Sequence, residues 1–170
     1  MAQLTDDCFA FAGPLLPVDD LERIMRERVQ PVSESETVPL AQSYHRVVTR
    51  DVVAPIDLPP FDNSAVDGYA VRHADLAPGA ESKLRIVDRI AAGHSGQRAV
   101  APGNAARIFT GAPMPDGADT VFMQEDCRAE DGIAILPPGL KAGANRRLAG
   151  EDIRSGSIAI PAGRVLGVQD

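Results

Sequence analysis

Short β-type runs separated by proline and glycine turns dominate the sequence from residue 55 onward. The chain holds 14 prolines and 15 glycines, and this density leaves little room there for a long helix. The dipeptides at 78–79, 102–103 and 138–139 are all Pro-Gly, which suits the central positions of a type II turn. Many short strands at this spacing predict a β-barrel-like or sandwich-like domain.

The expected strands follow the apolar and β-branched runs between these turns. Upstream of the turn-rich region we expect a short strand at 34–40, a single helical turn at 41–46 and a second strand at 47–53 that exits at Pro55. Downstream, the runs predict strands at 69–72, 84–90, 106–110, 120–124, 132–136, 145–148, 157–160 and 165–166.

One segment near the N-terminus has helical periodicity. Leu21, Ile24, Met25 and Val29 recur at helical spacing and predict a helix from about Asp20 to Val29. Asp19, followed three residues later by Glu22, predicts a capping box, and Pro31 is expected to end the segment. Residues 1–17 are expected to form an extended lead-in.

Composition restricts the partners and the compartment. The formal charge of -7 disfavours nonspecific nucleic-acid binding, although it leaves a small anionic ligand open. Aromatics make up 4%, so the core must rest on Val, Ile, Leu and Ala. Cys8 and Cys127 lack metal-ligand spacing and are read as free thiols in a reducing compartment. With no apolar run of membrane-spanning length and no basic leader, we expect a cytoplasmic protein without membrane or nucleic-acid partners.

The segment PPFDNSAVDGYAV at 59–71 concentrates polar side chains in a stiffened loop. Asp62, Asn63, Ser64 and Asp67 lie behind two prolines, and Gly68 allows a tight bend or a close backbone approach to a ligand. This pattern indicates a carboxylate held near an exposed edge. An ordinary Asx-rich turn explains the same composition.

A second loop begins where the strand at 107–109 ends. The hydroxyl of Thr110 and the amides of Gly111 and Ala112 are placed to bind an anion, unless Thr110 only ends the strand. The adjacent acids Glu125 and Asp126 would point to opposite faces of a strand, so they make a poor general acid–base pair.

A third segment pairs arginines with carboxylates. Arg147 is suited to hold a phosphate, and an internal ion pair with Glu151 or Asp152 is an equal alternative. The chain has no phosphate-loop, dinucleotide or nucleophile-elbow motif. His45, His73 and His94 have no metal-ligand spacing, so no zinc or other metal ligand is assigned.

Three segments in this order resemble the MoeA family of molybdopterin molybdenumtransferases, which includes the E-domain of gephyrin. They are PPFDNSAVDGYAV at 59–71, RIFTGAPMPDGADTVFMQED at 107–126 and GANRRLAGEDIRSG at 143–156. The third segment departs from the family pattern, because Arg146 occupies a position that is more often aliphatic.

The resemblance implies an enzyme that inserts molybdenum from molybdate into adenylated molybdopterin, with Mg²⁺, and releases AMP. It also implies a cytoplasmic, elongated homodimer. The expected fold is mainly β with one or two short N-terminal helices (α+β), in which an elongated dimerisation domain at 1–53 with 141–170 carries an inserted β-barrel-like domain at 54–140. The pterin-binding domain of the family would follow Asp170, in the same chain or another, so the 170-residue chain alone is expected to be inactive.

The resemblance also assigns residues. Asp67 and Thr110 match the family positions tied to activity and are the expected catalytic pair. The expected substrate-binding residues are Asp62, Asn63, Ser64, Gly111 and Arg147. The alternative function is a non-catalytic dimerisation or interaction module that lacks the pterin-binding domain.

Overall fold

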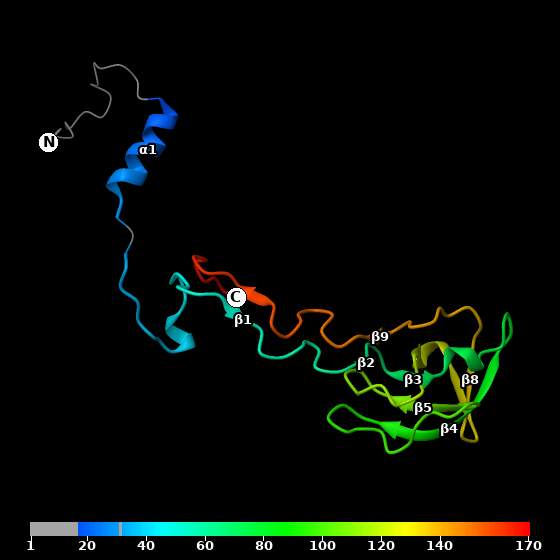
Figure 1. The fold of residues 1–170 in the computed structure, drawn as a ribbon. Helices are drawn as coiled ribbons and strands as arrows, with labels where there is room; N and C mark the ends of the chain where they lie inside the picture. The colour runs from blue at the N-terminus through cyan, green and yellow to red at the C-terminus, as the bar shows by residue number, and fades with distance from the viewer. Residues whose placement is uncertain (1–16, 31) are drawn as a thin grey trace. The chain divides into compact units, whose positions relative to one another are not determined.

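The computed structural model describes residues 17–30 and 32–170 (Figure 1). They belong to two compact units, one ending at Gln42 and the other comprising Ser43–Asp170. The first unit contains the helix α1, Val18–Arg28, and the 3₁₀ turn η1, Leu40–Gln42. No helix among the described residues is long and apolar enough to cross a membrane.

The predicted helix is confirmed, but its start differs from the expectation. Pro17 is the N-cap and no side chain caps the helix, so the capping box at Asp19 was wrong. Pro17 fixes a backbone angle that already suits helix entry, and Asp19 lies in the first turn, where a negative charge stabilises the helix dipole. The lead-in at 1–16, with Cys8, and Pro31 lie outside the described residues.

The predicted strand at 34–40 is wrong. Residues 34–39 have no regular structure, and Leu40 already belongs to η1. A strand needs a partner for its backbone groups, and none of the strands in the described part of the chain pairs with this segment.

A six-stranded sheet with the order β6-β3-β5-β4-β8-β7 forms the centre of the second unit. Only the β4–β5 pair is parallel. The turns η2, His73–Asp75, and η3, Gln124–Asp126, follow β3 and β6. Because Glu125 and Asp126 lie in η3, the expectation that they point to opposite faces of a strand was wrong. The strands are β3 Gly68–Val71, β4 Ser82–Ile90, β5 Asn104–Ile108, β6 Thr120–Met123, β7 Arg128–Glu130 and β8 Ile133–Leu136.

Apolar clusters cover both faces of the central strands. Neighbouring residues of one strand contribute to opposite clusters: Tyr69 and Val71 to one, Ala70 to the other. As expected from the scarcity of aromatics, the largest fully buried side chains are aliphatic, led by Ile90 and Ile108. At full burial, each such side chain contributes about 1.5–3 kcal/mol of transfer free energy.

A narrow antiparallel ribbon leads away from the sheet (Figure 1). It is built from β1, Val52–Val53, against β10, Ile158–Ile160, and from β2, Asn63–Ser64, against β9, Arg146–Arg147. Bridges at Val47–Val165 and Leu58–Ile153 extend the pairing. The end of the predicted strand at 47–53 is confirmed as β1, whereas its start and the predicted strand at 165–166 are only an isolated bridge. This ribbon joins segments about a hundred residues apart in sequence.

The overall class agrees with the expectation at the coarse level. The described chain is mainly β with one α-helix, and the sheet is an open, curled half-barrel, because β6 and β7 remain its two edges. The three Pro-Gly turns have Gly79, Gly103 and Gly139 at positive φ, as type II turns require. The discontinuous domain division at 53/54 and 140/141 stays a prediction.

Candidate functional site

The sheet topology brings Asp67, Thr110 and Gln124 to one end of three neighbouring strands. Asp67 precedes β3, Thr110 follows β5, and Gln124 follows β6. β3 lies between β5 and β6 and runs antiparallel to both, so its beginning meets their ends. Residues 43 positions apart therefore become neighbours.

The Asp67 carboxylate is held by two donors from one residue. The backbone N–H of Thr110 donates to Oδ1 at 2.8 Å, and the Thr110 hydroxyl donates to the same oxygen at 2.7 Å. The hydrogen bond from the Thr110 amide lowers the pKa of Asp67 most, followed by the hydrogen bond from the Thr110 hydroxyl. The charge of the nearby Arg107 guanidinium lowers it further. The carboxylate is therefore ionised at neutral pH, at a half-buried position.

Gly68 is required by space rather than by φ. A Cβ added there would lie 1.7 Å from the carbonyl oxygen of Phe122. The close backbone approach that the Asp-Gly pair indicated is thus an approach to β6, not to a ligand. It brings β6 so near that the amide of Gln124 donates to the carbonyl of Asp67 at 2.9 Å.

The amides of Gly111 and Ala112 donate within the chain in the described structure, and a substrate-binding role of Gly111 stays a prediction. Gly111 donates to the carbonyl of Ser64 at 2.8 Å, and Ala112 donates to that of Phe109 at 2.9 Å. Both hydrogen bonds stabilise the shape of the loop and satisfy backbone amides that would otherwise lack an acceptor. The donors of Thr110 do bind an anion, but that anion is the carboxylate of Asp67.

Asp62 is the second anchored carboxylate. Its Oδ1 accepts the amide of Ala149 at 2.7 Å, and its Oδ2 accepts Arg146 Nε at 3.0 Å and Arg146 Nη2. The Ala149 amide, followed by the Arg146 side chain, lowers the pKa of Asp62. The unusual Arg146 thus pairs with Asp62 and ties the first motif to the third.

Asn63 and Ser64 are buried and serve the backbone. The Asn63 side chain donates to the carbonyl of Phe61 at 3.2 Å, and the Ser64 hydroxyl donates to that of Val66 at 2.6 Å. In the described structure their polar atoms hold the shape of the loop. Contact of either side chain with a substrate stays a prediction.

Arg147 forms the internal ion pairs with Glu151 and Asp152 that the sequence left open as an alternative. Its Nε donates to Glu151 at 2.5 Å and its Nη2 to Asp152 at 2.6 Å. The bond from Arg147 and then the amide of Leu148 lower the pKa of Glu151. These groups are solvent-exposed, so an anion would have to compete with two carboxylates for this guanidinium.

The three motifs meet in one place. The first motif exchanges backbone bonds with the second, for example from the Met114 amide to the Asp62 carbonyl at 2.9 Å. It is also paired with the third through β2 and β9. The first motif therefore contacts both of the other segments that carried the family resemblance.

Sequence reasoning missed three side chains at this site: Arg107, Phe109 and Gln124. The Arg107 guanidinium stacks on Phe109 at 4.5 Å and on Tyr69 at 5.3 Å from the ring centroids. An arginine within a strand looks like a solvated residue, and only the strand order reveals that it faces Asp67.

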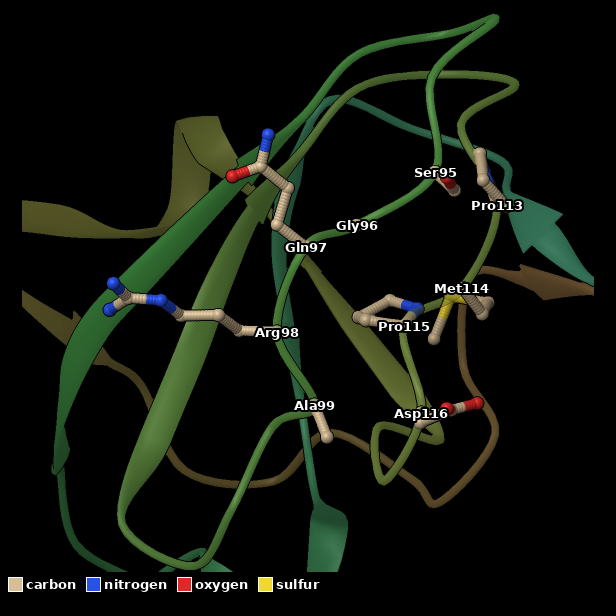
Figure 2. A pocket seen from close by; sticks show the side chains of 9 residues that line it. All are labelled: Ser95, Gly96, Gln97, Arg98, Ala99, Pro113, Met114, Pro115 and Asp116. Atoms are coloured by element: carbon tan, nitrogen blue, oxygen red, sulfur yellow. The ribbon is translucent and has the colours of Figure 1, made fainter.

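Two hollows in the described part of the chain lie elsewhere. One, of about 240 Å³, lies between residues 95–99 and 113–116 (Figure 2). In Figure 2 the side chains of Gln97 and Arg98 extend away from the 113–116 segment. A second, of about 260 Å³, is lined by residues around His73 and Pro138. Neither contains Asp67 or Thr110, and no cluster of three His, Cys, Asp or Glu suited to a metal occurs among residues 17–30 and 32–170.

Comparisons with known proteins identify the family. Residues 16–170 match the family description "MoeA N-terminal region (domain I and II)". The chain is 35% identical over 153 residues to a molybdopterin molybdenumtransferase of Haemophilus influenzae, covering 89% of this chain and 37% of the relative. It is 40% identical over 132 residues to that of Nostoc sp., covering 76% and 30%.

A solved structure agrees. The crystal structure of a molybdopterin biosynthesis MoeA protein from Pyrococcus horikoshii superposes with a TM-score of 0.83 at 30% identity, over 92% of this chain and 42% of that one. The chain thus spans between 30% and 42% of the length of these relatives. By sequence and by fold, it belongs to the MoeA family and corresponds to its N-terminal region.

Proposed function

We propose that this chain is the N-terminal part of an enzyme that inserts molybdenum from molybdate into adenylated molybdopterin. The observation that carries the proposal is that the first motif joins the other two: its Asp67 is held by Thr110 of the second motif, and its strand β2 pairs with β9 of the third. The matched relatives are named molybdopterin molybdenumtransferases, and the chain covers only their N-terminal part.

In this proposal Asp67 and Thr110 are the catalytic contribution of the chain to a composite cleft. Both bonds that Asp67 receives from Thr110 end on Oδ1, which leaves Oδ2 to face a substrate group or a metal-bound water. Thr110 keeps the carboxylate ionised and fixes its direction. The phosphate and pterin contacts would come mainly from the domain that follows in the family.

The proposal extends to Mg²⁺, which the family resemblance implies. Mg²⁺ is usually held by one or two carboxylates together with phosphate oxygens and waters. The described chain offers one such oxygen at Asp67, so the residues fit a shared site rather than a complete one. The ion would neutralise phosphate charge, whereas the chain's own part is to present an ionised carboxylate. A cytoplasmic location belongs to the same proposal.

The test uses the complete protein, in which this region precedes its pterin-binding domain. Asp67→Asn removes the charge at almost constant shape, and we expect the rate of molybdenum insertion to fall at least tenfold. Asp131→Asn is the matched control, because Asp131 lies in the β7–β8 turn at positive φ, where asparagine is well tolerated. Equal rates for the two variants would refute the role of Asp67. We further expect no turnover from the 170-residue chain alone, and measurable turnover would contradict that.

A second function, assembly with another copy, is favoured by exposed apolar pairs on the ribbon. Val53 lies opposite Ile158, and Val47 lies opposite Val165. About half of the surface of each of these four side chains is exposed. Contiguous exposed apolar surface often marks a protein–protein interaction site.

We propose that this surface forms a homodimer interface, as expected from the family. Light scattering of the chain should give a dimer at micromolar concentration, and Ile158→Asp should shift it to monomer. A monomer for the unchanged chain would contradict the dimer. If the complete protein showed no insertion activity, and calorimetry detected no molybdate or pterin binding, a dimer would support the interaction-module function instead.

A further inference from the structure

Arg107 reaches across the end of the sheet from β5. Its Nη1 donates to the carbonyl of Gly68 at 2.8 Å and to that of Ile108 at 3.3 Å. Its Nη2 donates to the side-chain oxygen of Gln124. One guanidinium thus connects Gly68, the first residue of β3, with Gln124, the residue after β6.

These contacts lie beside the peptide groups that follow the Asp67 side chain. Gln124 donates its own amide to the Asp67 carbonyl at 2.9 Å, and Arg107 holds both the Gln124 side chain and the next carbonyl along the chain. The peptide groups at Asp67 and Gly68 are therefore fixed from two neighbouring strands. Thr110 then only has to hold the carboxylate.

Aromatic rings fix the guanidinium in turn. Arg107 lies opposite Tyr69 in the β3–β5 register and stacks on Phe109 at 4.5 Å. Arg89, the register neighbour of Arg107 on β4, stacks on the same Phe109 ring at 4.6 Å. Like charges opposite one another in a sheet are unfavourable, so this pair requires the compensation that stacking on a ring provides.

Arg107 is not part of an ordinary ion pair. None of the salt bridges formed between described residues includes it, whereas several other arginines pair with acids, among them Arg72, Arg128, Arg146 and Arg147. Its guanidinium instead donates to two backbone carbonyls and to the side-chain oxygen of Gln124. A planar guanidinium with five N–H donors can bond several acceptors at fixed angles, which a lysine ammonium cannot do equally well.

We propose that Arg107 is a positioning residue for Asp67: it fixes the Gly68 carbonyl and the Gln124 side chain, and thereby holds the Asp67 carboxylate against Thr110. The importance of Arg107 for catalysis rests on the proposed function, in which Asp67 acts on the substrate. The positioning of Asp67 by Arg107 is a property of the 170-residue chain and does not depend on that function. It predicts that the planar shape of the guanidinium, as well as its charge, is needed to hold Asp67.

The experiment measures the Asp67–Thr110 contact by NMR in the 170-residue chain. Arg107→Met removes fork and charge, whereas Arg107→Lys keeps the charge and loses the fork. We expect hydrogen exchange of the Thr110 amide to accelerate about tenfold in both variants, as loss of one hydrogen bond predicts. In Arg107→Met the pKa of the Asp67 carboxyl should also rise.

Arg89→Met is the matched control, because it removes a guanidinium from the same ring without touching the Asp67 backbone. We expect its Thr110 exchange to stay within twofold of the unchanged chain. The amides of Leu84 and Ala134, in the β4–β8 pair, report general loosening of the sheet. If Arg107→Met does not fold, Arg107→Lys and Gln124→Met decide, and Gln124→Met should also accelerate Thr110 exchange.

Two results would overturn the proposal. One is a folded Arg107→Met or Arg107→Lys chain whose Thr110 exchange is unchanged, or rises only in parallel with that of Leu84 and Ala134. The other is an equal effect of Arg89→Met. Neither readout involves molybdenum insertion. Loss of Thr110 protection together with a fully active Asp67→Asn enzyme would refute the proposed function and leave the positioning role intact.

Discussion

Gly68→Ala tests whether the close contact between β3 and β6 builds the site. The new Cβ would lie 1.7 Å from the Phe122 carbonyl oxygen, and ordinary contacts begin near 3.4 Å. The two backbones must therefore separate by more than an ångström at this point. The atom that is hit belongs to the backbone of a buried strand, so no side-chain rotation can relieve the overlap.

The expected cost combines two terms. Overpacking costs about 1–3 kcal/mol, and each hydrogen bond lost from the β3–β6 ladder about 0.5–1.5 kcal/mol. We therefore expect the free energy of unfolding to fall by roughly 3–5 kcal/mol, a large part of the total of about 5–15 kcal/mol typical of a domain.

Gly79→Ala is the control for the loss of glycine itself. Gly79 has φ +72°, and nothing lies within 4 Å of an added Cβ there. Only the left-handed backbone opposes alanine, at about 1–2 kcal/mol. Urea unfolding at neutral pH compares the two variants. If Gly68→Ala is no more destabilising than Gly79→Ala, the argument from close approach is wrong.

Three further outcomes are expected. Thr110→Val removes the hydroxyl donor but keeps the amide, so the pKa of Asp67, measured by carbon NMR, should rise toward 3.8 and remain below it; an unchanged pKa would contradict the geometry. The lowered pKa of Asp62 means that its stabilising effect is present above 3.8 and is lost as pH falls through the lowered value. Arg146→Met should therefore lower the free energy of unfolding in urea at pH 7 by about 1–2 kcal/mol, and its stability should fall less steeply as the pH is lowered. If stability falls equally steeply with pH below pH 4 in the two proteins, the Asp62–Arg146 pair does not stabilise the fold. Burial raises the pKa of the Cys127 thiol from 9.0 to about 11, so in a Cys8→Ser chain it should alkylate at pH 7 about a hundredfold more slowly than an ordinary cysteine; rapid labelling would show that the thiol is accessible.

The sequence was informative where local chemistry decides the structure. Runs of β-branched residues between Pro-Gly turns predicted most strands, and Asp67 and Thr110 stood out by pattern and by family resemblance. Two strands were missed, Asn63–Ser64 and Arg128–Glu130, because neither is apolar. They are strands only because β9 and β8 supply their partners.

The site required tertiary information for a similar reason. The amides of Gly111 and Ala112 look free in a Gly-Pro loop, but the carbonyls that accept them come from the loop itself and from Ser64. The role of Arg107 depends on the order β6-β3-β5, which no local pattern encodes. Side-chain type indicated which groups are reactive, whereas strand order decided which of them meet.

The most direct test of the central claim is a double-mutant cycle on the complete protein, with molybdenum insertion as the assay. Asp67→Asn, Thr110→Val and the double variant are compared with the unchanged enzyme. If the carboxylate and the hydroxyl act as one unit, the double variant will be about as slow as the slower single variant. Rate losses that simply multiply, or an enzyme that retains full activity without either group, would contradict the account.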